Sequence, residues 1–513
     1  METVTLGSKA GKWIMVSSIL ASSMAFIDGT ALNVVLPALQ KSLNASGTDL
    51  FWILNAYLLM LAALMLIGGS LGDQLGRKKV FMAGILIFIG GSALCGFAPG
   101  VAYLVAFRAL QGIGGALMIP GSLSLISSAI NSKERGKAIG TWSAFTTVVT
   151  MGGPILGGAL ADAGLWRYIF FINVPIGLAA LFILARWVDE HKDDDASRKL
   201  DYRGAIAIAL GLGLLTFGFL RIPAVGWHNW QACGAIILGL TLLIVFVVIE
   251  KIEKHPMMPL SLFNNPTFTG ANLLTFFLYA GLGAGMLFMG LNMVQVQGYS
   301  QLQSGLTFLP FTILMVTIAR FAGGLADKYG PRLFLICGPG IAGLGLFILS
   351  FIKQTHGAPD YWSTFFPGIL VLGFGMSVTV APLTATVMGS VSDHFSGTAS
   401  GVNNAMSRIS GVFANAIFGA LAVLFFAGAL QNRVQSLPLN AGQKQAIISQ
   451  VNNLGNARVP ANIIENNKAP VQEAYHQSFI AAYARIMRIS AGLGFLGAMM
   501  AVAFIRNSAV KKD

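Results

Sequence analysis

Residues 69–79 read Gly-Ser-Leu-Gly-Asp-Gln-Leu-Gly-Arg-Lys-Lys, and residues 323–332 read Gly-Gly-Leu-Ala-Asp-Lys-Tyr-Gly-Pro-Arg. Both fit Gly-x3-Asp-x2-Gly followed by basic residues, and repeated halves are typical of secondary transporters. The glycines let two helix ends approach closely, and the aspartate can pair with a cation or a helix N-terminus. The repeat predicts a duplicated helical unit whose charged contacts form a gate, made of Asp73, Gly76, Arg77, Asp327, Gly330 and Arg332.

The composition is that of a membrane protein. Of the 513 residues, 55% are hydrophobic and 10% are charged, whereas a soluble protein carries about 25% charged residues. This difference excludes an ordinary soluble enzyme, a disordered chain and a coiled coil. The 61 glycines follow no Gly-X-Y period, so the chain is not collagen-like.

Fourteen apolar stretches are long enough to cross a bilayer as helices, which takes about 20 residues each. They cover residues 13–36, 49–71, 80–98, 102–130, 138–161, 168–187, 203–221, 231–250, 268–291, 303–326, 333–352, 362–388, 400–426 and 486–506. Because the repeated motif returns eight spans later, we expect an all-α membrane protein with two six-helix bundles and two additional helices. The bundles occupy residues 1–187 and 268–513, and residues 188–267 hold a linker and the two extra transmembrane helices.

The positions of Lys and Arg set the expected orientation, because basic residues gather in cytoplasmic connections. Most of the 33 basic residues lie on one side when both termini are placed in the cytoplasm. The net charge of +13 then reports topology, and we expect no nucleic-acid partner. The repeated gate falls on the cytoplasmic face, where its basic residues could also act simply as topology anchors.

Two connections are longer than the others. Residues 188–202 mix acidic and basic side chains, which predicts a solvated cytoplasmic linker. Residues 427–485 are rich in amides and form a long outer loop, interpreted as a cap without chemistry. At the end of that loop, residues 471–483 have helical apolar spacing, which predicts a helix lying along the membrane surface.

Asp28 is the one acidic residue placed well inside a span. An ionised group at mid-bilayer costs roughly 2.5–3.5 kcal/mol or more, so its presence favours a function. Arg108 lies at a similar depth in a span that runs the opposite way, since a helix rises about 1.5 Å per residue. An arginine that approaches or leaves Asp28 would switch the carboxyl group between releasing and holding a proton. The alternative is a static ion pair that fixes helix packing.

Polar stripes mark further candidate residues, at positions that share one helix face. They contain Gln111 in the fourth span, Trp142 and Thr146 in the fifth, Tyr279 in the ninth, and Asn404 and Arg408 in the thirteenth. These side chains are candidates for a substrate cavity, although hydrogen bonds between helices explain the uncharged ones equally well.

The fifth span also contains Gly-Gly-Pro-Ile-Leu-Gly-Gly at residues 152–158. Proline removes a backbone hydrogen bond and glycines permit close packing, so a kink at a helix crossing is expected. The residues of interest are Gly153, Pro154, Gly157 and Gly158.

The sequence carries no signature of a catalytic, metal or cofactor site. It has no Gly-x4-Gly-Lys-Ser/Thr loop and no His or Cys spacing suited to a metal. No Ser-His-Asp set or cysteine nucleophile can be assembled from it. We therefore expect no enzyme activity, no cofactor and no metal.

Several of these stretches together resemble the major facilitator superfamily, in its fourteen-helix drug:proton antiporter branch. Residues 26–37, Phe-Ile-Asp-Gly-Thr-Ala-Leu-Asn-Val-Val-Leu-Pro, resemble the first-span signature of the branch. Residues 69–79 resemble the cytoplasmic gating motif, and Arg-Ala-Leu-Gln-Gly-Ile-Gly at 108–114 resembles the fourth-span motif with its proton-linked arginine. Residues 152–158 resemble the antiporter motif, and residues 166–175 resemble the connection into the sixth span.

The resemblance implies the major facilitator fold and proton-coupled export of small amphipathic compounds, that is, multidrug efflux across the inner membrane of a bacterium. Asp28 and Arg108 would carry the proton coupling, with one proton per cycle. Two departures weaken specific expectations. Gln74 stands where a base is usual, and the tenth span lacks an acidic residue that some exporters of dicationic drugs carry.

Three functions remain open on the sequence alone. The first is a broad exporter, and the second is an exporter dedicated to one metabolite or antibiotic, which strict substrate selectivity would reveal. The third is a non-transporting receptor or embedded enzyme, which the missing catalytic residues disfavour. The expected partners are the substrate, protons and the lipid bilayer, and the chain acts either as a monomer or with a periplasmic adaptor protein.

Overall fold

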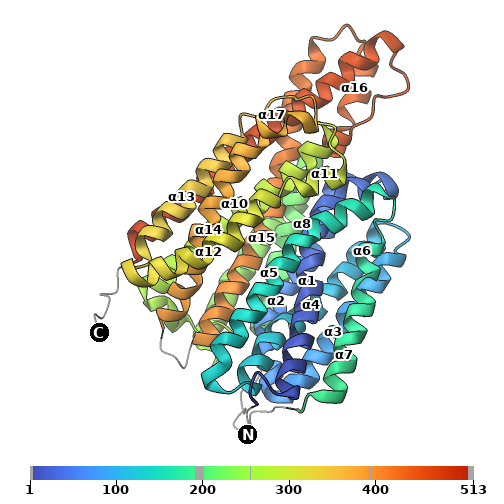
Figure 1. Ribbon diagram of the computed structural model, residues 1–513. Coiled ribbons are helices and arrows are strands. Elements are labelled where there is room, and N and C mark those ends of the chain that lie inside the picture. Colours follow the sequence, from blue (N-terminus) through green and yellow to red (C-terminus); the bar gives the residue numbers. More distant parts are fainter. Residues whose placement is uncertain (1–3, 191–200, 255, 392–395, 507–513) are drawn as a thin grey trace.

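The computed structural model describes residues 4–190, 201–254, 256–391 and 396–506. Figure 1 shows a bundle of long helices with both chain ends at one end of the molecule. The first half contains α1 (Lys9–Leu43), α2 (Gly47–Leu75), α3 (Arg77–Phe97), α4 (Val101–Ala129), α5 (Ser132–Asp162), α6 (Tyr168–Phe171) and α7 (Asn173–Trp187). The two helices between the halves are α8 (Tyr202–Val225) and α9 (Trp230–Ile252).

The second half begins with a short 3-10 helix, η1 (Leu260–Asn264), which is followed by further helices joined by short connections. It contains α10 (Pro266–Gln295), α11 (Gln301–Leu306), α12 (Leu309–Tyr329), α13 (Arg332–Leu349), η2 (Ala358–Trp362), α14 (Phe365–Gly389), α15 (Ser396–Gln435), α16 (Ala441–Ile448), η4 (Val451–Asn456) and α17 (Glu465–Phe504). Within the described part of the chain, thirteen helices are long and apolar enough to cross a membrane, and α5 adds a shorter apolar stretch, Val148–Asp162. The predicted all-α membrane fold is confirmed.

The two halves repeat the same scheme of neighbouring helices. In the first half α1 packs against α5 and α7, α2 against α4, and α3 against α4 and α7. In the second half α10 packs against α15 and α17, α12 against α14, and α13 against α14 and α17. Each pair in one half has its counterpart in the other, which is the arrangement that a duplicated six-helix unit produces.

The repeated motif has the same backbone shape in both halves. Gly76 ends α2 with φ 107° and ψ 127°, and Gly330 ends α12 with φ 87° and ψ 147°. Only glycine adopts such angles at low cost, so both glycines are needed to turn the chain into the next helix. The conformation explains why the motif keeps its second glycine at the same place in both copies.

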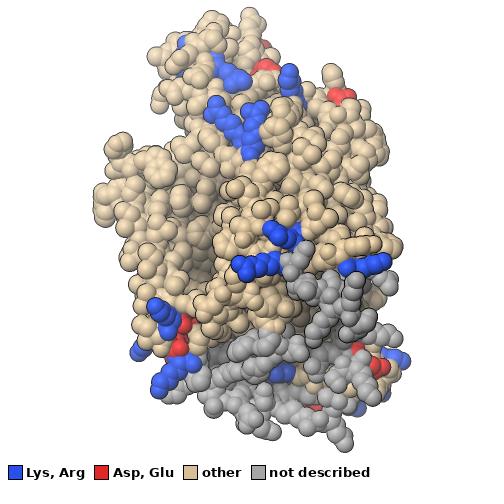
Figure 2. All heavy atoms as spheres, turned by 90° about the vertical axis from the view of Figure 1, so that its left-hand side faces the viewer, with Lys and Arg blue, Asp and Glu red and all other residues tan. Residues whose placement is uncertain are grey.

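The extra helices lie beside the two halves. Helix α8 packs against α2, α15 and α9. Helix α9 exposes a row of large apolar side chains, including Ile237, Ile244 and Val248, as expected of a surface that faces lipid. Figure 2 shows on one side of the molecule a band of uncharged residues, with Lys and Arg gathered beyond it toward either end.

The linker prediction was wrong for Asp201, which is only 4% exposed. Its Oδ1 accepts a hydrogen bond from the backbone N of Gly204 at 2.8 Å, and Asp201 thereby caps the N-terminus of α8. Glu250 at the end of α9 is also buried, and its Oε2 accepts from the backbone N of Met258 at 2.9 Å. Residues 191–200 of the predicted linker lie outside the described residues.

The prediction of a surface helix at residues 471–483 was also wrong. These residues form the first turns of α17, which continues without a break to Phe504. The apolar side chains of this segment are buried, namely Val471, Tyr475, Phe479 and Tyr483. They form one apolar stripe that continues along α17 into the membrane span. The segment from α15 to α17 projects beyond the bundle, at the end of the molecule opposite the chain termini (Figure 1).

At this end, hereafter the outer end, the two halves are in close contact. The carboxylate of Asp162, the last residue of α5, accepts hydrogen bonds from Ser300 Oγ at 2.7 Å and from the backbone N of Gln301 and Leu302 at 2.9 Å. Below it, a Cβ atom on Gly158 would lie 2.5 Å from the carbonyl oxygen of Gln301. Helix α5 therefore touches α11 without intervening side chains.

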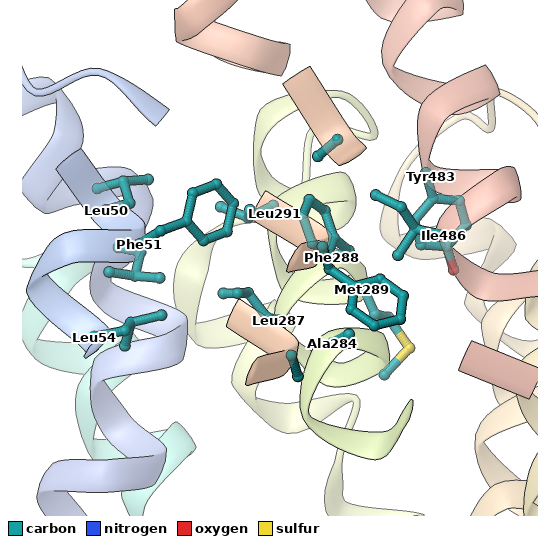
Figure 3. Close-up of a cluster of buried hydrophobic side chains, with 14 of the residues drawn as sticks. Leu50, Phe51, Leu54, Ala284, Leu287, Phe288, Met289, Leu291, Tyr483 and Ile486 are labelled. Carbon is teal, nitrogen blue, oxygen red and sulfur yellow. The ribbon is translucent and has the colours of Figure 1, made fainter. Parts of the chain in front are cut away.

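An apolar cluster closes the outer end on a second side. Phe51 of α2 lies against Phe288 of α10, with 5.9 Å between ring centroids. Figure 3 shows Leu50, Phe51 and Leu54 facing Leu287, Phe288 and Leu291 across the boundary between the halves. The outer end is thus closed by apolar packing together with the hydrogen bonds of Asp162.

A larger residue at Gly158 should open this contact. We expect Gly158→Leu to separate α5 from α11 and to lengthen the distance between spin labels placed at Ala163 and Ser436. Pulsed electron spin resonance measures that distance in a background with the native cysteines replaced. Gly152→Leu is the matched control, because Gly152 lies on the same helix with open space around it. An unchanged distance distribution in Gly158→Leu would contradict the close contact.

Candidate functional site

Asp28 and Arg108 form a buried ion pair inside the first half. Arg108 Nη1 of α4 donates to Asp28 Oδ2 of α1 at 2.5 Å, and the two side chains are 1% and 0% exposed. The two charged groups, which were predicted to lie at a similar depth, are therefore in direct contact. Because both are removed from solvent, loss of either partner would leave a buried charge uncompensated, which typically costs about 3–5 kcal/mol.

Gln111 completes this site, one helical turn after Arg108. Its Oε1 accepts from Arg108 Nη1 at 2.8 Å, and its Nε2 donates to Asp28 Oδ1 at 2.9 Å. Gln111 is 0% exposed and both ends of its amide group are bonded to the ion pair, so its place in a substrate cavity stays a prediction. Its position at i+3 on the inward face of α4 turns it toward the ion pair.

Two further groups seal the ion pair. The guanidinium of Arg108 lies over the ring of Tyr57 on α2, 4.3 Å from the centroid, and Phe170 lies on another side at 6.0 Å. Arg108 Nε also approaches the carbonyl oxygen of Ile53 at 3.4 Å. Each carboxylate oxygen of Asp28 therefore has one donor, and solvent reaches the carboxyl group only after these helices move.

Residues 152–158 of α5, which resemble the antiporter motif, pack closely against α1 within one turn of Asp28. Thr30 occupies the space that a side chain at Gly153 would need, and its Oγ1 lies 3.2 Å from the carbonyl oxygen of Thr150. A Cβ atom on Gly157 would lie 2.7 Å from the carbonyl oxygen of Ala31. The expected close helix crossing is present, and α5 continues as one helix through Pro154. Any movement of α5 acts directly on the turn that holds Asp28.

Trp142 and Thr146 are engaged in helix contacts. Trp142 Nε1 donates to Ser22 Oγ on α1 at 3.1 Å. Thr146 is 4% exposed and its hydroxyl donates to the carbonyl oxygen of Trp142 at 2.9 Å. The stripe was interpreted either as part of a substrate cavity or as a set of hydrogen bonds between helices. The structure favours hydrogen bonds between and within helices.

The stripes on α10 and α15 meet each other. Asn403 Nδ2 donates to Asn272 Oδ1 at 3.1 Å and to Thr275 Oγ1 at 2.7 Å. Asn403 lies beside the predicted residue Asn404, which is exposed, and its role was missed because the neighbouring helix could not be identified from the sequence. Arg408 and Tyr279 lie one turn farther along the two helices and are partly exposed.

The described bases of the gate motif contact their own half of the molecule. Arg77 Nη1 lies 3.5 Å from the carbonyl oxygen of Ser124 on α4. Arg332 Nη2 donates to the carbonyl oxygen of Val502 on α17 at 3.1 Å. The side chains of Asp73 and Asp327 lie outside the described residues, and a gate formed by this motif stays a prediction.

Asp162 is the functional candidate that sequence reasoning missed. It directly follows the fifth predicted span, residues 138–161, and its carboxylate bridges the two halves. Its position just before the predicted outer connection was the available signal. Among the described residues, no group of three or more His, Cys, Asp or Glu side chains is arranged to hold a metal ion.

Comparison with known proteins places this geometry in a family. The family model described as Major Facilitator Superfamily matches residues 18–415. The tetracenomycin C resistance and export protein of Streptomyces glaucescens is 28% identical over 93% of this chain and 89% of its own length. The multidrug transporter protein MdtP of Bacillus subtilis is 29% identical over 81% of this chain and 76% of its own.

Solved structures agree at the level of the fold. A bacterial homologue of the human lysosomal transporter Spinster, crystallised in an inward-facing, unoccupied conformation, superposes with a TM-score of 0.63 at 19% identity. The match covers 98% of this chain and all of that one. With the duplicated bundle, the thirteen candidate membrane helices of the described residues and the family match taken together, this chain belongs to the major facilitator superfamily of membrane transporters.

Proposed function

We propose that this protein exports small amphipathic compounds in exchange for protons. The buried contact between Asp28 and Arg108 is the observation that carries the proposal, because it gives one carboxyl group whose charge depends on helix position. Relatives named for multidrug and antibiotic resistance support drug efflux. The name of the tetracenomycin relative favours a second candidate, an exporter dedicated to one such compound.

The proposed cycle uses two helical units that rock about a central site, with a local shift of helices inside the first unit. The units are residues 1–187 and 268–513, flanked by the linker and extra helices at 188–267, in the inner membrane with both termini cytoplasmic. In the state described here the outer end is closed by Asp162 and the apolar cluster. When the outer end opens, α5 leaves α11, and its glycine contacts with α1 shift the turn that holds Asp28. Arg108 then moves away and the carboxyl group takes up a proton from outside.

Energy does not limit this exchange. One elementary charge that crosses about 100 mV supplies about 2.3 kcal/mol. Because a tenfold concentration ratio corresponds to about 1.4 kcal/mol, one proton supports a gradient of about fortyfold before the pH difference is added.

Replacing the carboxyl group should uncouple transport. We expect Asp28→Asn to abolish substrate accumulation driven by an imposed pH gradient in proteoliposomes, while exchange of substrate across the membrane without a gradient persists. Asparagine still accepts a hydrogen bond from Arg108 but carries no exchangeable proton. Asp360→Asn, in an exposed connection, serves as the control. Uphill accumulation by Asp28→Asn at the wild-type rate would refute proton coupling through this residue.

Asp28 and Arg108 should also behave as one unit in stability. Arg108→Gln leaves Asp28 as an unpaired buried carboxylate, and we expect a loss of about 3–5 kcal/mol with a lower unfolding temperature. The double variant Asp28→Asn with Arg108→Gln should recover most of that loss without recovering coupled transport. Thermal unfolding in detergent gives the comparison, and additive losses in the double variant would contradict the pairing.

A further inference from the structure

Arg408 lies where three helices from both halves meet. On α15, the preceding turn contacts α10 through Asn403, which donates to Asn272 and Thr275. The following turn faces α2, because a Cβ atom on Gly411 would lie 3.6 Å from Leu58. Arg408 is thus held at the boundary between the first half, through α2, and the second half, through α10 and α15.

This boundary lies deep in the membrane region. Asn403, five residues before Arg408 on α15, donates to Thr275 of α10, so Arg408 lies close to the level of Tyr279, one turn after Thr275. With a rise of about 1.5 Å per residue, Tyr279 is about 20 Å from the start of α10 at Pro266 and about 24 Å from its end at Gln295. Neither end of the helix is within reach of an arginine side chain, so snorkelling to the membrane surface does not account for Arg408.

Arg408 differs from Arg108 in having no counter-ion among the described residues. Within the part of the chain that the structure describes, no carboxylate pairs with Arg408 and no acceptor receives a hydrogen bond from it. The side chain is partly exposed, and Asn404, one turn earlier on the same face, is exposed. A cation at this depth is costly and marks a pathway for an ion or a substrate.

The nearest deep acid cannot supply the missing charge. Asp28 is fully buried and its two carboxylate oxygens are occupied by Arg108 and Gln111. An organic cation that enters between the halves therefore meets an uncompensated positive charge, whereas an organic anion meets a guanidinium with free donors. Guanidinium binds carboxylates through two parallel hydrogen bonds, which gives both strength and orientation.

We propose that Arg408 is the anion-recognising residue of the substrate site, and that the preferred substrates are amphipathic organic anions such as aryl carboxylates. The inference rests on the proposed export function and names its substrate class. Tyr279 of α10 is partly exposed, so its aromatic ring can contact the apolar part of such a compound.

The charge of the substrate determines how much net charge crosses the membrane in each transport cycle. Exchange of one inward proton for one outward monovalent anion moves two positive charges inward per cycle. The same exchange with a neutral compound moves one, and with a monovalent cation it moves none. Export of the anion should therefore respond more steeply to membrane potential than export of a neutral analogue.

Binding to the protein in lipid nanodiscs tests the proposal directly. The probes are 1-naphthylacetate, its neutral amide 1-naphthylacetamide, and the cation 1-naphthylmethylammonium, which share one ring system. We expect the wild type to bind the anion at least tenfold more tightly than the amide or the cation. Arg408→Gln should lose that preference while it keeps its affinity for the amide, which also shows that the variant is folded.

Two further variants separate charge from position. Arg408→Lys keeps the charge and should retain most of the preference for the anion. Arg433→Gln removes an arginine from the outer end of the same helix and should bind all three probes as the wild type does. Equal affinity of the wild type for anion and amide, an equal loss of both in Arg408→Gln, or no saturable binding of the anion would overturn the proposal.

Transport of the same probes distinguishes this inference from the function on which it rests. If a pH gradient drives the amide or the cation as well as the anion, proton-coupled export stands and the anion preference falls. If the anion binds through Arg408 but a pH gradient moves none of the probes, the anion site stands and the export proposal falls.

Discussion

The contact between Asp28 and Arg108 is the constraint on which the rest of the structure depends. Both charges are almost fully removed from solvent, and each is tolerated there only because the other is present. The helices around them are arranged to keep that contact closed. Gln111 bridges the pair, and Tyr57 and Phe170 cover the guanidinium. In the proposed cycle this sealed site opens to exchange a proton, which requires a mechanical connection to the moving parts of the molecule.

Helix α5 provides that connection. On one side its glycines contact α1 next to Asp28, and on another its outer end contacts α11 across the boundary between the halves. The same short stretch of small residues therefore serves the proton site and the outer closure. We expect larger residues at Gly153 or Gly157 to disturb the contact with α1 and a larger residue at Gly158 to disturb the contact with α11, since no side chain fits between the helices there. These two contacts explain why residues 152–158 of α5 are rich in glycine, a feature that predicts little when it is considered alone.

Much of the architecture followed from the sequence, because long apolar stretches and the repeated motif constrain a membrane protein strongly. The depth of Asp28 and Arg108 could be predicted from helix rise alone, and their contact agrees with it. Side-chain directions could not be predicted in the same way. Gln111 has the spacing of a cavity residue but turns toward the ion pair, and Asp201 lies in a charged segment but caps a helix. The direction of residues 471–483 was misjudged: neither proline nor glycine lies between them and the membrane span, so the helix continues straight into the span.

The two deep arginines have different roles in this account. Arg108 is neutralised within the first half, whereas Arg408 stands without a counter-ion at the boundary between the halves, among the described residues. In the proposed cycle the proton and the substrate therefore meet separate charges, and movement of the helices that open and close the outer end couples them. Coupling of this kind is thermodynamic, so it requires only that each ligand favours one of the two states.

The most direct measurement is the reaction of Asp28 with dicyclohexylcarbodiimide, an apolar reagent that modifies protonated carboxyl groups. Mass spectrometry of the peptide that contains Asp28 reports the extent of modification in membranes. The account predicts that modification of Asp28 increases as the pH is lowered and increases further when Gly158→Leu opens the outer end. Modification that is absent under all these conditions, or independent of both pH and the open state, would contradict the account.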